Sequence, residues 1–189
     1  MSLNQQFMIK AKQQLSGMWI SAVLATLIYL ALLSVASCTY VAQLIIVGPL
    51  TLGYYLFIIA LTGYKKADYN TLFDGFKNFG QTLVAGLLIS LATAVGFALL
   101  IVPGVILSLG FAMTYFIMID DPKISGIDAM QASWNMMKGH KTELFCLYCR
   151  FIGWLLLCVL TCGILTLWIQ PYLTAATLNF YRNLRYGQY

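Results

Sequence analysis

An uncharged stretch of 22 residues, 81–102, limits what this chain can fold into more than any other feature of its sequence. Because a helix rises about 1.5 Å per residue, such a stretch crosses the roughly 30 Å hydrocarbon layer of a membrane. A second apolar run, residues 105–119, follows it after Pro103 and Gly104. Proline lacks a backbone donor and glycine has a flexible backbone, so we expect the chain to reverse at this pair. The sequence therefore predicts a helical hairpin in a membrane.

The composition supports a membrane protein throughout the chain. Of the 189 residues, 61% are hydrophobic and 9% are charged, whereas about a quarter of the residues in soluble proteins are charged. The apolar runs predict six transmembrane helices, which are residues 19–36, 41–63, 81–102, 105–119, 144–161 and 164–181. We expect an all-α, polytopic fold of three hairpins in a single membrane domain. No cleavable signal peptide is expected, because residues 1–16 are polar and amphipathic.

Each hairpin is predicted to follow an amphipathic helix that lies in the plane of the membrane. The apolar faces of these three helices consist of Leu3, Phe7, Ala11 and Leu15, then Tyr69, Leu72, Phe73, Phe76 and Phe79, and then Ile127, Met130, Trp134 and Met137. We expect Gly80 to end the second helix, a capping box from Ser125 to Asp128 to begin the third, and Gly139 to end it. The alternatives are a frayed N-terminus and an ordinary connecting loop.

Glycine spacing indicates an internal repeat. Gly80 and Gly104 are 24 residues apart, as are Gly139 and Gly163, and each pair runs from an in-plane helix to an outer turn. The predicted units are approximately residues 1–66, 69–121 and 125–185, all with the same orientation. The alternative is a chance alignment of glycines in an apolar sequence.

The lysines and arginines lie on one side of the predicted hairpins, and the outer turns carry none. The positive-inside rule then places both termini and two loops in the cytoplasm, which requires an even number of spans. A nucleic-acid partner is not expected, because the basic residues are spread over separate segments. The in-plane helices would instead contact membrane lipids, and a protein partner or a second copy of the chain is also compatible with this arrangement.

Three sites are predicted to disturb a straight helix. Gly48 and Pro49 interrupt the second span, where proline removes a backbone hydrogen bond and bends or breaks the helix. Pro171 is expected to bend the sixth span. Pro103 and Gly104 form the turn described above.

Arg150 is the one charged residue inside a predicted span. It follows Glu143 by seven residues, about two helical turns, and its side chain can lean back toward Glu143 or a lipid phosphate. The alternative is a buried partner or a contact with a substrate.

Asp120 and Asp121 end the fourth span, at a helix C-terminus where negative charge is unfavourable. We expect a compensating cation, with Lys77, Lys141, His140 and Arg150 as candidates. The pair forms either a structural salt bridge or a helix stop, or else an ion or substrate site. His140, the only histidine, is expected to face solvent or lipid headgroups rather than to act in catalysis.

No catalytic, cofactor or metal site is expected. The chain has no nucleophile elbow, zinc-protease or phosphate-loop motif, so we do not expect an enzyme. The five cysteines, Cys38, Cys146, Cys149, Cys158 and Cys162, lie in or beside apolar runs and are interpreted as small packing residues. Only Cys38 and Cys162, near the outer turns, offer a disulfide as an alternative.

Several ordered motifs resemble the bacterial integral-membrane family catalogued as domain of unknown function 975. These motifs are Gly48-Pro49-Leu50 with Gly53-Tyr54, the run from Leu72 to Phe79, Val102-Pro103-Gly104, Asp120-Asp121-Pro122, the run from Met137 to Lys141, Phe145, and Phe151-Ile152-Gly153-Trp154. The resemblance covers nearly the whole chain and implies a multi-pass protein of the bacterial inner membrane, without an activity. Trp134 departs from the family pattern, which has a basic residue there.

Two functions follow as expectations. The first is a protein that acts through lipid or partner contacts of its cytoplasmic in-plane helices. The second is a transporter or channel for a small solute or lipid, in which broken helices surround a cavity and Arg150 or Asp120 contacts the substrate. A lipid-modifying enzyme is a third, weaker alternative.

Overall fold

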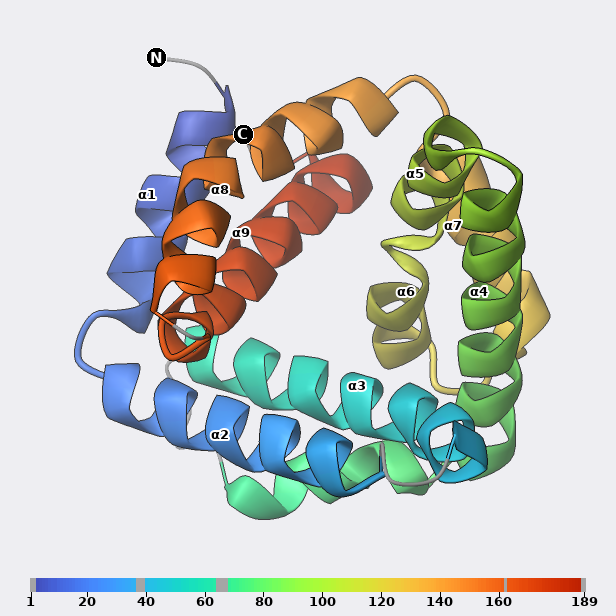
Figure 1. The fold of residues 1–189 in the computed structure, drawn as a ribbon, viewed down its shortest axis with the longest axis horizontal. Coiled ribbons are helices and arrows are strands. Elements are labelled where there is room, and N and C mark those ends of the chain that lie inside the picture. Colours follow the sequence, from blue (N-terminus) through green and yellow to red (C-terminus); the bar gives the residue numbers. More distant parts are fainter. Residues whose placement is uncertain (1–2, 37–39, 64–67, 162, 188–189) are drawn as a thin grey trace.

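The computed structural model describes residues 3–36, 40–63, 68–161 and 163–187, and within these ranges the chain is helical without any strand (Figure 1). The α-helices are α1 (Leu3–Leu15), α2 (Trp19–Ala36), α3 (Tyr40–Thr62), α4 (Phe79–Leu99), α5 (Ile101–Phe111), α6 (Thr114–Asp120), α7 (Gly126–Met136), α8 (Lys141–Leu160) and α9 (Thr166–Tyr186). A 3₁₀ helix, η1 (Tyr69–Phe76), lies between α3 and α4. The all-α prediction is confirmed.

Three helical stretches of the described residues are long and apolar enough to cross a membrane: Ile45–Thr62, Phe79–Leu99 and Ile101–Asp120. Asn4–Leu15 and Trp19–Ser34 would provide a fourth if they formed one span, although the chain bends by 98° between them. The structure thus shows three or four such stretches, and the prediction of six is matched only in part. Lys65, Lys66, Cys38 and Cys162 lie outside the described residues.

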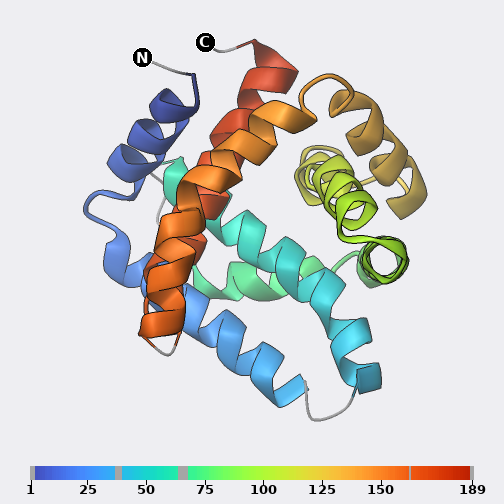
Figure 2. The ribbon, with the colours of Figure 1, turned by 45° about the horizontal axis from the view of Figure 1, so that its top comes forward.

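Helix α9 is the central helix of one half of the molecule, where it contacts α1, α2, α3 and α8. Residues 174–181 of α9 are all buried, although this stretch includes two threonines and Asn179. The Asn179 amide nitrogen donates to the Phe7 carbonyl oxygen at 3.4 Å and to Gln14 Oε1 at 3.1 Å, which ties α1 to α9. Both views show α1 and α9, the first and last helices, in the same half of the molecule (Figures 1 and 2).

We expect Asn179→Leu to loosen α1 from α9. The leucine keeps the branching at Cγ but leaves Gln14 and the Phe7 carbonyl without this donor, and a lost buried hydrogen bond costs about 1–3 kcal/mol. Thermal unfolding of the purified protein in detergent should show a lower midpoint, and proteolysis should release the N-terminal helix first. Asn135→Leu, an exposed site on α7, is the control; equal midpoints for the two variants would contradict the prediction.

The chain reverses at Leu100 and not at Pro103-Gly104, so that prediction is wrong. Leu100 is extended, with φ −165° and ψ 154°, and Pro103 and Gly104 lie in the first turn of α5. The first four amides of a helix have no intrahelical acceptor, so proline costs no hydrogen bond there. Gly104 lets α5 approach α4, because a Cβ at this position would lie 2.6 Å from the Phe97 ring.

A break at Gly48-Pro49 is excluded, whereas the bends predicted at Gly48-Pro49 and at Pro171 stay predictions. Helix α3 continues through Gly48 and Pro49, and α9 continues through Pro171, so neither proline ends its helix. The expected fourth span, residues 105–119, is divided into α5 and α6 near Met113. The loss of one backbone bond at a proline is tolerated when neighbouring helices hold the segment in place. Pro49 and Pro171 are both buried among such neighbours.

The amphipathic segments are helical, with differences in detail. Residues 69–76 form a 3₁₀ helix, and Gly80 lies in the first turn of α4 instead of ending the preceding helix. Only Leu72 and Gly75 of this segment are buried, so the expected aromatic face is largely exposed. The serine half of the capping box is confirmed, since Ser125 Oγ accepts from the Asp128 amide at 3.1 Å, while Asp128 Oδ2 accepts from the Ser125 hydroxyl at 2.7 Å. Gly139 follows α7 with φ +86°, a conformation that favours glycine.

The predicted repeat of three equivalent units stays a prediction. Consecutive helices pack together as pairs, with α2 against α3, α4 against α5 and α8 against α9. In Figure 1, α4 runs upward along the right side and α8 runs downward to the left.

Candidate functional site

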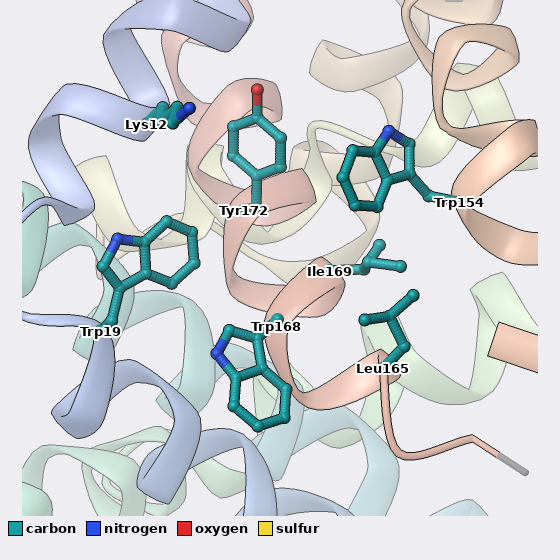
Figure 3. Close-up of a pocket in the computed structure, with 7 residues that line it drawn as sticks. All are labelled: Lys12, Trp19, Trp154, Leu165, Trp168, Ile169 and Tyr172. Carbon is teal, nitrogen blue, oxygen red and sulfur yellow. The ribbon is translucent and has the colours of Figure 1, made fainter. Parts of the chain in front are cut away.

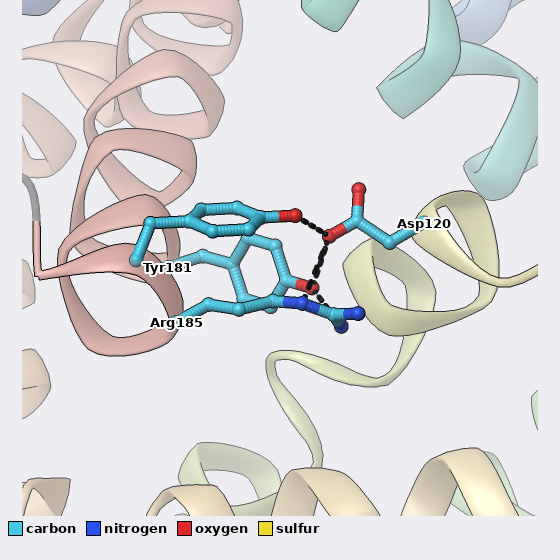
Figure 4. Close-up of polar contacts among 4 residues, drawn as sticks. Asp120, Tyr181 and Arg185 are labelled. Atoms are coloured by element: carbon cyan, nitrogen blue, oxygen red, sulfur yellow. Dashed lines mark hydrogen bonds and ion pairs between the residues drawn. The ribbon is translucent and has the colours of Figure 1, made fainter.

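Asp120, Tyr181, Arg185 and Tyr186 form a polar group that we call the Asp120 cluster (Figure 4). Asp120 ends α6, and the other three residues lie on the last turns of α9, where Tyr181 and Arg185 share a face because they are four residues apart. Asp120 Oδ2 accepts hydrogen bonds from the Tyr181 hydroxyl at 2.7 Å and the Tyr186 hydroxyl at 2.9 Å. Arg185 Nε lies 3.3 Å from the same oxygen, and Arg185 Nη1 donates to the Tyr181 hydroxyl at 2.7 Å.

The negative charge of Asp120 is balanced by the positive charge of Arg185 within the Asp120 cluster. The hydrogen bond to Asp120, together with some burial, raises the pKa of Tyr186. Burial lowers the pKa of Arg185, but the charges and hydrogen bonds of Tyr181, Asp120 and Tyr186 outweigh it and raise this pKa overall. Two hydroxyl donors and one cation meet at a single carboxylate oxygen and hold α6 against α9. This arrangement is that of a structural contact between distant segments.

The cation that compensates Asp120 is Arg185, so the prediction of Lys77, Lys141, His140 or Arg150 is wrong. Lys77 pairs with Asp74 at 2.8 Å, and Lys141 lies over the Trp134 ring at 3.3 Å. Arg185 lies in the last turn of α9, a helix C-terminus that favours cations. The spacing of Tyr181 and Arg185 was the available signal for a shared partner.

The remaining predicted residues lie at separate places. His140 Nδ1 is 3.3 Å from Glu143 Oε2, and Asp121 Oδ1 accepts from the Lys123 amide at 3.2 Å. Asn4 donates to the Glu143 carbonyl oxygen at 3.1 Å, which joins α1 to α8. Arg150 is exposed on α8 and lines a cavity with Lys12 of α1. Arg150 and Asp120 therefore do not form one site.

An open, largely apolar cavity of about 480 Å³ lies where α1, α2, α8 and α9 meet, and we call it the tryptophan pocket (Figure 3). It is lined by Lys12, Trp19, Trp154, Leu165, Trp168, Ile169 and Tyr172. Figure 3 shows Lys12 and the Tyr172 hydroxyl at one end and Leu165 with Trp168 at the other. The pocket thus has a cationic end and an apolar end.

A second cavity of about 450 Å³, which we call the cationic pocket, adjoins the tryptophan pocket at Lys12 and Tyr172, which line both. Its other lining residues are Gln5, Met8, Ile9 and Arg150. Sequence reasoning missed both cavities, although Leu165, Trp168, Ile169 and Tyr172 share the i, i+3, i+4, i+7 spacing of one helix face.

The fold and these sites define a helical protein with stretches apolar enough to span a membrane. Residues 93–188, half of the chain, match the family described as Protein of unknown function (DUF975), and the chain belongs to this family. The resemblance noted from the sequence motifs is thus confirmed. No curated protein and no solved structure matches the chain.

Proposed function

We propose that this protein is a multi-pass protein of the bacterial inner membrane that crosses the membrane six times, with both termini in the cytoplasm. It acts by binding membrane lipids, and its contacts extend to a protein partner or a second copy; it catalyses no reaction and binds no nucleic acid. The tryptophan pocket carries this proposal, since an open aromatic cavity beside cationic side chains suits a molecule that is apolar at one end and anionic at the other.

The placement of the polar residues supports the proposal that α9 crosses the membrane. This helix contains most of residues 164–181, the least apolar of the six predicted spans. A polar helix is tolerated in a membrane when its polar groups face other helices. Residues 174–181 of α9 are buried, and Thr174 and Thr177 donate to carbonyl oxygens of their own helix at 2.9 Å. The hydrocarbon layer would therefore contact the apolar outer helices.

The placement of the exposed apolar residues supports immersion of α4 and α5. Leu99, Leu100, Ile101 and Val102 are 68–74% exposed at the turn between these helices. Four consecutive exposed apolar residues are unfavourable in water, where they form an apolar patch. In a membrane the same residues contact lipid.

Cysteine labelling of intact cells tests the topology. Cysteines are introduced singly at Lys77, Lys138 and Leu100 after the native cysteines are replaced by alanine. We expect a membrane-impermeant maleimide to leave the Lys77 and Lys138 positions unmodified until the membrane is permeabilised, because both are cytoplasmic. The cysteine at position 100 should react with the impermeant maleimide under unfolding conditions without permeabilisation, because the turn at Leu100 lies on the outer side. Modification of the Lys138 position in intact cells would overturn the topology.

A further inference from the structure

We propose that the tryptophan pocket and the cationic pocket together bind one anionic glycerophospholipid, with its phosphate at Lys12 and Arg150 and an acyl chain among the tryptophans. This inference deepens the proposed function and rests on it. It assigns the ligand class, the residues that contact each part of the ligand, and the direction in which the lipid lies.

The cationic pocket has the charge that a phosphate requires. Lys12 extends from α1 and Arg150 from α8, and both line the same cavity with the polar side chain of Gln5. None of the described residues that line either cavity is acidic. An arginine guanidinium presents paired donors that match phosphate oxygens, and a lysine adds a mobile positive charge. The two side chains together therefore favour a phosphate over a neutral headgroup.

The tryptophan pocket has the chemistry that an acyl chain requires. Apart from Lys12, its lining consists of three tryptophans, one tyrosine, one leucine and one isoleucine. The volume of about 480 Å³ lies within the roughly 300–1,000 Å³ typical of ligand cavities. The aromatic rings of such residues are favoured at the boundary between hydrocarbon and headgroups, where one end of the side chain is apolar and the other is polar.

Lys12 and Tyr172 set the direction of the bound lipid, because they line both cavities. The Tyr172 ring lies 6.5 Å from the Trp19 ring, between centroids, while its hydroxyl points toward the Lys12 end in Figure 3. A lipid that passes this point places its glycerol region beside the tyrosine hydroxyl. Its phosphate then lies toward α1, beside Lys12.

A lipid fits these observations better than a soluble anion or a protein partner. A soluble phosphate would use the cationic pocket alone and would leave the adjoining apolar cavity without a role. A peptide would need donors or acceptors for its backbone, and the tryptophan pocket offers few polar groups. The ligand that uses both cavities has an anionic head and an aliphatic tail.

Tryptophan fluorescence of the full chain in vesicles tests the proposal. The Trp134→Phe variant keeps only the three tryptophans of the pocket, because Trp134 lies elsewhere, against Phe111. This variant is reconstituted in vesicles of phosphatidylcholine that contain a minor fraction of one brominated lipid, either phosphatidylglycerol or phosphatidylcholine. In both cases the acyl chains of the minor lipid are brominated, and bromine quenches tryptophan on contact. We expect stronger quenching by the brominated phosphatidylglycerol. Its association constant for the protein should exceed that of phosphatidylcholine about fivefold or more.

Charge variants then locate the headgroup. Lys12→Gln with Arg150→Gln should reduce the quenching by brominated phosphatidylglycerol to the level of the brominated phosphatidylcholine. Lys138→Gln, which removes an exposed lysine outside both cavities, is the matched control and should keep the preference. If the double variant does not fold, Lys12→Gln alone should lower the preference about fivefold. An unchanged preference in the Lys12 variant would overturn the assignment.

The remaining outcomes distinguish the possible ligands. Displacement of the brominated lipid by inorganic phosphate alone would show an anion site without a lipid chain, and would contradict the proposal. Equal quenching by both brominated lipids would show a membrane protein without this specific site. No quenching by either lipid would instead overturn the proposed function itself, because the tryptophans would then lie outside the membrane.

Discussion

Gly75→Ala is expected to be among the most destabilising single substitutions in this chain. The Gly75 backbone lies against α3, and a Cβ there would overlap the Pro49 carbonyl oxygen and lie 2.8 Å from the Gly53 amide nitrogen. Both obstacles are backbone atoms of a buried helix, which cannot rotate aside as a flexible side chain does. Overpacking typically costs about 1–3 kcal/mol, and we expect the upper end of this range because η1 must move away from α3.

Thermal unfolding in detergent measures this effect. Gly53→Ala should behave like Gly75→Ala, since its Cβ would overlap the Leu72 carbonyl oxygen from the other side of the same contact. Gly153→Ala on α8 is the matched control, because nothing lies within 4 Å of its added Cβ. Leu72 is 1% exposed, so a cysteine at this position should react slowly with maleimide when Gly75 is present. In the double variant with Gly75→Ala, the same cysteine should react rapidly. Equal midpoints for Gly75→Ala and Gly153→Ala would refute the close contact.

Asp120→Ala is expected to detach the end of α9 from α6. The substitution removes the shared acceptor of two tyrosine hydroxyls and the ion pair with Arg185. A hydrogen bond to a charged group contributes about 1.5–3 kcal/mol when buried, and solvent screens part of this here, because the Asp120 and Arg185 side chains are 27% and 33% exposed. We therefore expect a loss of about 3 kcal/mol for the whole group, less than the sum of its contacts.

The neighbouring carboxylate provides the control for Asp120. Asp121→Ala removes a side chain of the same chemistry that contacts only a local amide in the described structure, so the change should stay within about 0.5 kcal/mol. Limited proteolysis after Arg185 reports detachment of the helix end directly. A double-mutant cycle of Asp120→Ala with Tyr181→Phe should show coupling; additive effects would mean that the two residues do not interact.

The Asp120 cluster also predicts how stability depends on pH. The pKa of Tyr186 is raised in the folded protein by its hydrogen bond to Asp120. A raised pKa stabilises the fold while the phenol is protonated, which holds below the usual tyrosine pKa of about 10. This contribution is lost as the pH rises through the raised value. Tyr186→Phe should remove that part of the alkaline loss, as unfolding midpoints measured across the alkaline range will show.

The class of the protein follows from properties that neighbouring residues determine. An uncharged run of 22 residues indicates a helix in an apolar environment, independently of its tertiary contacts. Helix α4 is accordingly long and apolar. The capping box at Ser125 joins residues three positions apart, so its hydrogen bond could be predicted before the fold was known. The family motifs are likewise read along the chain, and the match over residues 93–188 includes those from Val102 onward.

The partners of these elements depended on the tertiary structure. An apolar face shows that a helix is covered by apolar groups on that side. Lipid and another helix cover it equally well, so the sequence does not specify which helix packs there. Asp120 pairs with Arg185, 65 positions later in the chain, because α6 and α9 meet. Lys12 shares a cavity with Arg150 because α1 lies beside α8. Pro103 similarly became part of a helix because the chain reversed three residues earlier, at Leu100. Short-range hydrogen bonding and hydrophobicity are encoded locally, whereas contacts between distant side chains exist only once the helices have packed.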